Sequence, residues 1–331
     1  MNRNPRSRRQ AGMSLIELMI SMTLGLMILM GLTSLFVQSK RSFKQDELVA
    51  RMQEDARFAM TELQRDVALA GFWADVLDPS PIVNMSAGVT GALYTYGTAI
   101  EVYDNSDGTE DPFGDGTLDD LVAGTDVIAI AKLAGSKTAT ATVGTDAPDA
   151  FAELDPADVY LITNGVVARM ALGADMPATD ADVPGAMGVP APYTLWEYDP
   201  VIYFVRDYYT TAGDGIPTLC RKTLVDAAMT VECLAAGVED FQVEYGIDTD
   251  DDDYADRYVS APTAAQMLLV TSVRCYILMR GTDQDPNYVN GKTYLLSNSA
   301  LDHDDPGDGY YRRIYSTTIM VRNNAHLMAL N

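Results

Sequence analysis

The feature that most constrains this chain is an apolar segment near its N-terminus, from Met13 to Val37, in which Glu17 is the only charged residue. As an α-helix, at about 1.5 Å per residue, the segment would be roughly 37 Å long, enough to cross a hydrocarbon core of about 30 Å. A cleaved secretory signal has an apolar region of only about 7–15 residues, followed by a small-residue cleavage site. This segment is too long and no such site follows it. The sequence therefore predicts a helix that holds the chain in a membrane.

The charge of the chain changes sign behind its first residues. The leader carries Arg3, Arg6, Arg8 and Arg9 and no acid, whereas the whole chain has 23 Lys and Arg residues against 47 Asp and Glu residues. The net charge of −24 repels phosphate groups, so nucleic acid is not expected as a partner. A basic leader ahead of an acidic body suggests a targeting segment. Because long domains translocate largely regardless of charge, we expect the body to lie outside the cytoplasm.

The sequence contains none of the usual enzyme signatures. GxSxG, HExxH, P-loop and GxGxxG patterns are absent, and the three cysteines and two histidines show no metal-binding spacing. A protein that performs no chemistry itself is the expectation.

Glu17 is unusual because an acid in a membrane helix costs about 2.5–3.5 kcal/mol at the helix centre and less near an end. A position at the level of the lipid headgroups would explain it. The residues around it offer a second explanation, since Gly12 ends the basic leader and Glu17 is the fifth residue after it. This arrangement resembles the type IV prepilin signal, although that family usually has Phe where this chain has Met13.

The resemblance implies that a prepilin peptidase cleaves between Gly12 and Met13 and methylates the new amine of Met13. In a helical polymer, Glu17 of one subunit would then neutralise the Met13 amine of its neighbour. Burying two opposite charges together costs far less than burying either alone, so the pair would set axial register rather than add net stability.

Helical periodicity continues beyond the membrane segment. Apolar residues recur at three- and four-residue spacings, which is one face of an amphipathic helix; they are Leu48, Met52, Ala56, Ala59, Leu63, Val67 and Ala70. We predict one long helix from about Ser14 to Ala70, whose second half packs on a globular domain. An ordinary surface helix behind an anchor is the alternative. The expected division is a leader (1–12), a membrane or filament-core helix (13–37), a stem helix (38–71) and a β-rich domain (72–331).

Short apolar runs at Asp126–Leu133 and Val159–Thr163 predict strands separated by long loops. The pattern of the second half of the chain predicts more regular β-structure. Val201–Arg206 is apolar and β-branched, and apolar residues alternate with polar ones in 241–247, 273–279 and 315–321. Such strands predict an antiparallel sheet with one face on the stem helix. The expected fold class is therefore α+β.

Three further segments resemble the PilW family of minor pilins. They are Leu63–Phe72, Gly237–Gly246 and Arg312–Asn323. With the leader, they imply a type IV pilin-like fold and a non-enzymatic role in initiating or assembling type IV pili, in a priming or tip complex. The implied partners are the peptidase, other minor pilins, the major pilin and a tip adhesin. The chain would begin in the inner membrane and end in the pilus. A J-type pseudopilin of type II secretion and a membrane-anchored periplasmic enzyme or binding protein are the alternatives.

An acidic segment offers a candidate calcium site. Acids fall at positions 1, 3, 5 and 9 of an EF-hand-like loop; they are Asp248, Asp250, Asp252 and Asp256. However, Asp253 and Val259 stand where such a loop has Gly and Glu. A solvated acidic turn is the favoured alternative, and no other cofactor is implied.

Two cysteines are spaced for a disulfide in an exported domain. Cys220 and Cys233 flank an expected hairpin, which favours their pairing and leaves Cys275 as a buried thiol. Pairings of either with Cys275 stay open. His303, in an acidic loop, is expected to be exposed to solvent rather than to bind a metal.

Overall fold

The computed structural model describes residues 12–76, 82–86, 99–114, 116, 118, 120–141, 151, 154–179, 182–226 and 228–323. The chain forms two compact units, Met1–Arg51 and Met52–Asn331. The boundary lies inside the long helix, so the second half of the predicted stem belongs to the globular unit. The leader arginines lie outside the described residues.

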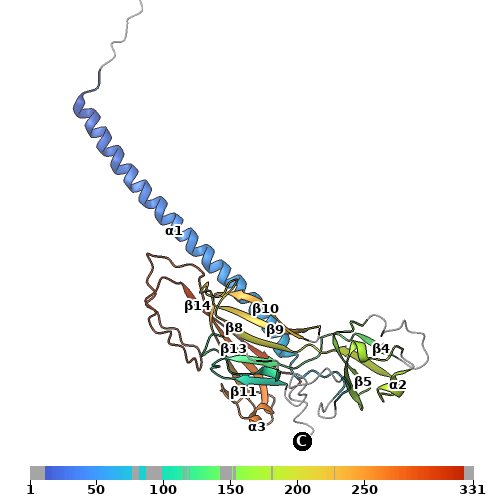
Figure 1. Ribbon diagram of the computed structural model, residues 1–331. Helices are drawn as coiled ribbons and strands as arrows, with labels where there is room; N and C mark the ends of the chain where they lie inside the picture. The colour runs from blue at the N-terminus through green and yellow to red at the C-terminus, as the bar shows by residue number, and fades with distance from the viewer. Residues whose placement is uncertain are drawn as a thin grey trace, which may run out of the picture. The chain divides into compact units, whose positions relative to one another are not determined.

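The N-terminal helix α1 runs without a break from Leu15 to Ala68 (blue in Figure 1). Both ends are within two residues of the predicted ones. In the first unit, none of its residues is buried. In the second unit, one face is buried, as the spacing of the apolar residues predicts; the buried residues are Met52, Ala56, Ala59, Met60, Leu63, Asp66 and Val67.

The described part of the globular unit contains three sheets, not the single sheet expected. The first has the order β1-β6-β5-β7-β4, made of Val83–Asn84, Ala168–Leu172, Val159–Thr163, Tyr193–Glu197 and Ala139–Ala141. The second has the order β10-β9-β8-β3-β2, made of Ala228–Ala236, Thr218–Val225, Val201–Arg206, Val127–Ile130 and Ile100–Tyr103. The third has the order β12-β11-β13-β14, made of Arg257–Val259, Val238–Ile247, Val270–Arg280 and Arg312–Met320.

Strand pairing is antiparallel throughout these sheets except between β1 and β6, which are parallel. Short helices complete the described fold; they are η2 (Pro112–Gly114), η3 (Gly173–Asp175), α2 (Val183–Ala186) and α3 (Ala264–Met267). The α+β class and the antiparallel character are as expected. The first sheet lies in the part of the sequence where only isolated short strands were expected.

The main core forms where α1 packs on the second and third sheets. Leu63 and Val67 of α1 are fully buried in one cluster with residues of β8, β11 and β13. Burying a side chain of this size contributes about 1.5–3 kcal/mol, so this stripe accounts for much of the attachment of the stem. A second cluster joins β3 and β8 to β5 and β6, and a third belongs to the first sheet. The stem is thus part of the core of the domain rather than a linker to it.

Candidate functional site

The predicted cleavage site lies immediately before α1. Gly12, Met13 and Ser14 precede the helix and are exposed. The carbonyl oxygen of Ser14 accepts the first helical hydrogen bonds, from the backbone N–H of Glu17 at 3.0 Å and of Leu18 at 3.1 Å. The Gly12–Met13 bond therefore lies in non-helical backbone.

Glu17 lies in the first turn of α1, and its side chain is exposed. A carboxylate in this position interacts favourably with the N-terminal end of the helix dipole, by about 0.3–1 kcal/mol. No salt bridge to Glu17 is formed within the described part of the chain.

The helix that follows is apolar enough to cross a membrane, judged by length and composition alone. None of the residues in its most apolar stretch is buried, and large side chains such as Leu29 and Phe36 are more than half exposed. Exposed apolar surface on this scale marks contact with lipid or with other protein.

A buried ionic cluster holds the second half of α1 against the sheets. We call Asp66, Lys132, Tyr203 and Arg221 the stem cluster. The hydroxyl of Tyr203 donates to Asp66 Oδ2 at 2.6 Å, and Lys132 Nζ lies 3.5 Å from Asp66 Oδ1. Arg221 Nη1 lies 3.7 Å from Asp66 Oδ2 and 2.7 Å from Oε2 of Glu62, one helical turn earlier.

The stem cluster is largely shielded from solvent. The side chains of Asp66 and Lys132 are each 2% exposed, and Lys132 also forms an ion pair with Asp199. Burial, reinforced by the Asp66 carboxylate, raises the pKa of Tyr203 well above its usual range, so its hydroxyl remains a donor. A buried charge is stable only when its partners are in place. The cluster therefore fixes the rotation of the stem relative to β8 and β9.

Sequence reasoning missed the stem cluster, although one signal was available. Asp66 lies three residues after Leu63 and one before Val67, inside the apolar stripe of the helix. An acid on a face that is buried needs partners. The identity of those partners was not readable, because Lys132 and Arg221 are far away in sequence.

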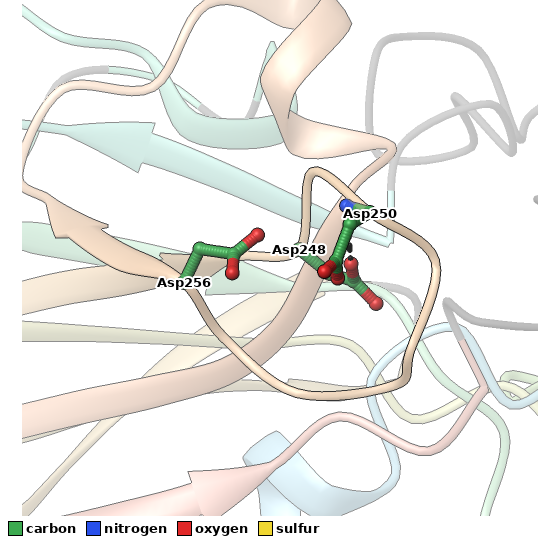
Figure 2. A group of neighbouring side chains, drawn as sticks. All are labelled: Asp248, Asp250 and Asp256. Carbon is green, nitrogen blue, oxygen red and sulfur yellow. Dashed lines mark hydrogen bonds between the residues drawn. The ribbon is translucent and has the colours of Figure 1, made fainter.

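The acidic segment forms a turn that brings three carboxylates together. One oxygen each from Asp248, Asp250 and Asp256 lies within 4.8 Å of the others (Figure 2). Asp252, which the spacing included, does not belong to this group; its Oδ1 accepts a hydrogen bond from the backbone N–H of Tyr254.

Half of the carboxylate oxygens in this group accept hydrogen bonds within the turn. Asp248 accepts hydrogen bonds from the backbone N–H groups of Asp250, Asp251 and Asp253, and Asp256 Oδ2 accepts from Thr249. Repulsion from the neighbouring carboxylates of Asp252 and Asp256 raises the pKa of Asp250. Calcium takes about 6–8 oxygen ligands, and this turn supplies three carboxylates, of which two already serve the loop. Asp250 and Asp256 are exposed and Asp248 is buried, so the turn is only partly solvated and offers fewer oxygens than calcium takes.

The structure joins Cys220 and Cys233 in a disulfide across the β9–β10 hairpin, where the two residues are a register pair. Cys275 is a free, buried cysteine on β13. Burial raises the pKa of its thiol to about 12, so it is a packing residue with little reactivity.

The expectation for His303 was wrong. It is buried, and its Nε2 lies 2.9 Å from Oδ2 of Asp240, which is completely buried on β11. The hydroxyl of Ser299 donates to the same oxygen at 2.5 Å. The acidic composition of this loop gave no sign of this long-range contact, which attaches the loop to the third sheet.

Comparisons with known proteins match both ends of the chain. Residues 202–323 match the family described as Type IV Pilus-assembly protein W (PilW), and residues 7–33 match the prokaryotic N-terminal methylation motif. No curated protein matches the chain. Among solved structures, a type IV-like pilin from Thermus thermophilus is similar, with a TM-score of 0.38 and 13% identity over 82% of this chain and 98% of that one.

Proposed function

We propose that this chain is a minor pilin similar to the PilW family, whose model matches residues 202–323, and that it acts in the complex that initiates type IV pilus assembly or occupies the pilus tip. It would be made as an inner-membrane precursor with its globular unit outside the cytoplasm. A prepilin peptidase would then remove residues 1–12 and methylate Met13. The main support for the proposal is the match of residues 7–33 to the methylation motif, which overlaps the start of an exposed apolar helix at Leu15.

The proposed assembly contact is electrostatic within an apolar surrounding. Cleavage would give Met13 a positively charged amine next to the apolar helix. The Glu17 carboxylate, exposed in the first helical turn, would pair with this amine on an adjacent subunit. Because an unpaired charge is costly in such a surrounding, a subunit would be held only in the register that satisfies both charges.

The globular unit would supply partner selectivity. Its stem is fixed by the apolar stripe and by the stem cluster, so it offers a rigid surface to neighbouring minor pilins, the major pilin or a tip adhesin. Rigid surfaces bind with a smaller loss of conformational entropy than mobile ones do.

Deletion of the chain and complementation with variants test this function. We expect deletion to reduce surface pili strongly while exoprotein release stays normal. Glu17→Ala should be cleaved yet enter pili at about one tenth of the wild-type level. The substitution would leave the Met13 amine of the neighbouring subunit without a compensating carboxylate, at a cost in assembly free energy of roughly 1.4 kcal/mol or more. Glu54→Ala, at an exposed acid on the same helix, is the matched control and should assemble normally. Normal pili with blocked exoprotein release would instead indicate a type II secretion pseudopilin.

A further inference from the structure

Within the described residues, β14 is an edge strand of the third sheet that is long and uninterrupted. Unpaired backbone groups attract other strands, so proteins shorten their edge strands or interrupt them with bulges, Pro or Lys. At the opposite edge of the same sheet, β12 has three residues. The edge strand β10 of the second sheet has a bulge between Cys233 and Ala235. By contrast, β14 pairs with β13 over nine residues without a register shift, and it contains neither Pro nor Lys.

The register of β14 identifies the backbone groups that face away from β13. The N–H of Val321 donates to the Thr271 carbonyl, and the N–H of Gly281 donates to the Tyr311 carbonyl, each at 2.9 Å. Bonded and outward-facing residues alternate along an antiparallel strand. The outward-facing residues of β14 are therefore Arg312, Ile314, Ser316, Thr318 and Met320. Within the described residues, these outward groups have no backbone hydrogen bond to another segment.

A groove of about 420 Å³ lies beside this edge, between β14 and the stem. Tyr315 and Thr317 line one side, and Gln53, Arg57 and Thr61 of α1 line the other. A strand added to β14 would lie about 4.8 Å from it and would point every second side chain toward one face of the sheet. On the stem side, those side chains would enter the groove.

Arg57 lines the groove, and Arg313 lies two residues before Tyr315, which also lines it, in an otherwise acidic chain. Arg57 on the stem and Arg313 on β14 are both exposed. Neither forms an ion pair with a carboxylate in the part of the chain that the structure describes. Since the chain as a whole has a net charge of −24, two guanidinium groups without a carboxylate partner among the described residues favour an acidic occupant beside this edge.

Antiparallel pairing with a second copy of β14 does not fit this position in a pilus. Gln64 Nε2 donates to Thr317 Oγ1 at 2.6 Å, and Asn323 Nδ2 donates to the Ala70 carbonyl at 3.3 Å, so β14 runs in the same direction as the stem. Antiparallel pairing of two β14 strands about a two-fold axis would make the two stems antiparallel. Subunits inserted from the same side of a membrane have stems that run in the same direction.

We propose that the open edge of β14 binds an extended, acidic strand of a different, neighbouring pilin subunit, which adds to the third sheet and places alternate side chains in the groove against α1. Strand addition of this kind takes affinity from backbone hydrogen bonds and specificity from the side chains in the adjoining pockets. The proposal rests on the assembly function proposed above and names the surface through which a partner is selected.

Proline substitutions in the full chain test the site by position. Thr318→Pro removes an outward N–H and keeps the β13 ladder, and Pro is tolerated where its missing N–H faces outward. We expect an unfolding midpoint within about 2 °C of wild type and about a tenfold loss of pili. Thr317→Pro, the adjacent control, removes an N–H bonded to β13 and should unfold the domain.

If Thr318→Pro also unfolds, the double variant Arg57→Glu and Arg313→Glu, at two exposed positions, tests the same site and should likewise reduce pili. Wild-type pilus numbers in a folded Thr318→Pro variant, or in the double arginine variant, would overturn the proposal.

A photo-crosslinking residue at Ser316 identifies the occupant in cells. The expected product joins it to an acidic segment of another subunit that carries the N-terminal methylation motif. The same residue at Val231, on the bulged edge β10, is the control and should give no such product. Cross-links only to a second copy, to this chain itself or to no pilin subunit would overturn the choice of occupant. Normal pili after deletion of the whole chain would refute the proposed function instead.

Discussion

The two halves of α1 share one backbone conformation and differ in their surroundings. Up to Arg51, large apolar side chains point outward on all sides of the helix, as Leu29 and Phe36 do. From Met52 onward, apolar residues form one buried stripe that includes Leu63 and Val67. Helical propensity fixes the backbone in both halves. The distribution of apolar residues, all round or on one face, decides whether a helix seeks lipid and other helices or packs on its own domain.

Two of the acids of α1, Glu17 and Asp66, show the same contrast. Asp66 lies on the buried stripe and is surrounded by Lys132, Arg221 and the Tyr203 hydroxyl from the same chain. Glu17 lies in the apolar half, and no salt bridge to it is formed within the described residues. An acid on an apolar surface needs a partner in either half. The difference supports the proposal that the partner of Glu17 comes from another subunit.

Matched leucine substitutions should produce the largest difference between the halves. Leu63→Ala removes a fully buried side chain and should lower the free energy of unfolding by about 3 kcal/mol, through lost burial and the cavity left behind. Leu29→Ala removes an exposed side chain and should leave the value unchanged. Chemical denaturation of both full-length variants in detergent measures this. Equal losses would show that the first half also packs within its own chain.

Asp66→Asn should have the next largest effect. The amide keeps the shape of the side chain but leaves Lys132 and Arg221 with less compensating charge, at a cost of about 2 kcal/mol. Lys132 retains Asp199, and Arg221 retains Glu62, which limits the loss. Combined with Tyr203→Phe, the loss should be less than additive, because both changes disrupt one network. Full additivity in denaturation experiments would argue against a shared cluster.

The pH dependence of stability should originate in the globular unit. Burial raises the pKa of Asp126 to about 7, with further contributions from the carboxylates of Asp104 and Asp240. The folded protein therefore binds this proton more tightly than the unfolded chain does. Its contribution to stability is complete at low pH and is lost as the pH rises from about 4 to about 7, by at most about 1.4 kcal/mol per pH unit.

Asp126→Asn should flatten this decline in the free energy of unfolding, measured across the same pH range. Asp207→Asn, at an exposed position, is the matched control and should keep the wild-type slope. An unchanged slope in the Asp126 variant would assign the pH dependence to other groups.

Removal of calcium should have the smallest effect. Asp248 and Asp256 already accept hydrogen bonds within their turn, so chelation should shift the unfolding midpoint by less than about 1 °C. Thermal unfolding with a chelator and with millimolar calcium measures this. A rise of several degrees with calcium, abolished by Asp250→Asn, would show that the turn is a metal site.

How much of the fold was predictable depends on the range of the signal. The limits of α1 and the strands β5 and β8 follow from local patterns, and the structure has these elements close to or at the predicted residues. The first sheet was not predictable as a unit, because it joins β1 to β6 across more than eighty residues. Apolar periodicity predicts a strand and its buried face but not the strands that pair with it. For this reason the sequence did not show that the strands divide among three sheets.

The predictions of individual site residues also succeeded where the signal was local and failed where it depended on distant parts of the chain. The pairing of Cys220 with Cys233 lies within one hairpin, and the spacing favoured it. Asp252 was included with its neighbours because the pattern cannot give side-chain directions in a turn. The burial of His303 depends on Asp240, which lies on a distant strand. Composition describes the solvent exposure of a segment on average, and tertiary contacts reverse it at individual residues.

The mass of the mature N-terminus, measured on protein purified from membranes and from sheared pili, tests the central claim most directly. The account predicts a chain that begins at Met13 with a methylated amine in both fractions. A chain that retains Met1 and occurs only in the membrane fraction would contradict it and would leave the apolar half of α1 as a simple anchor.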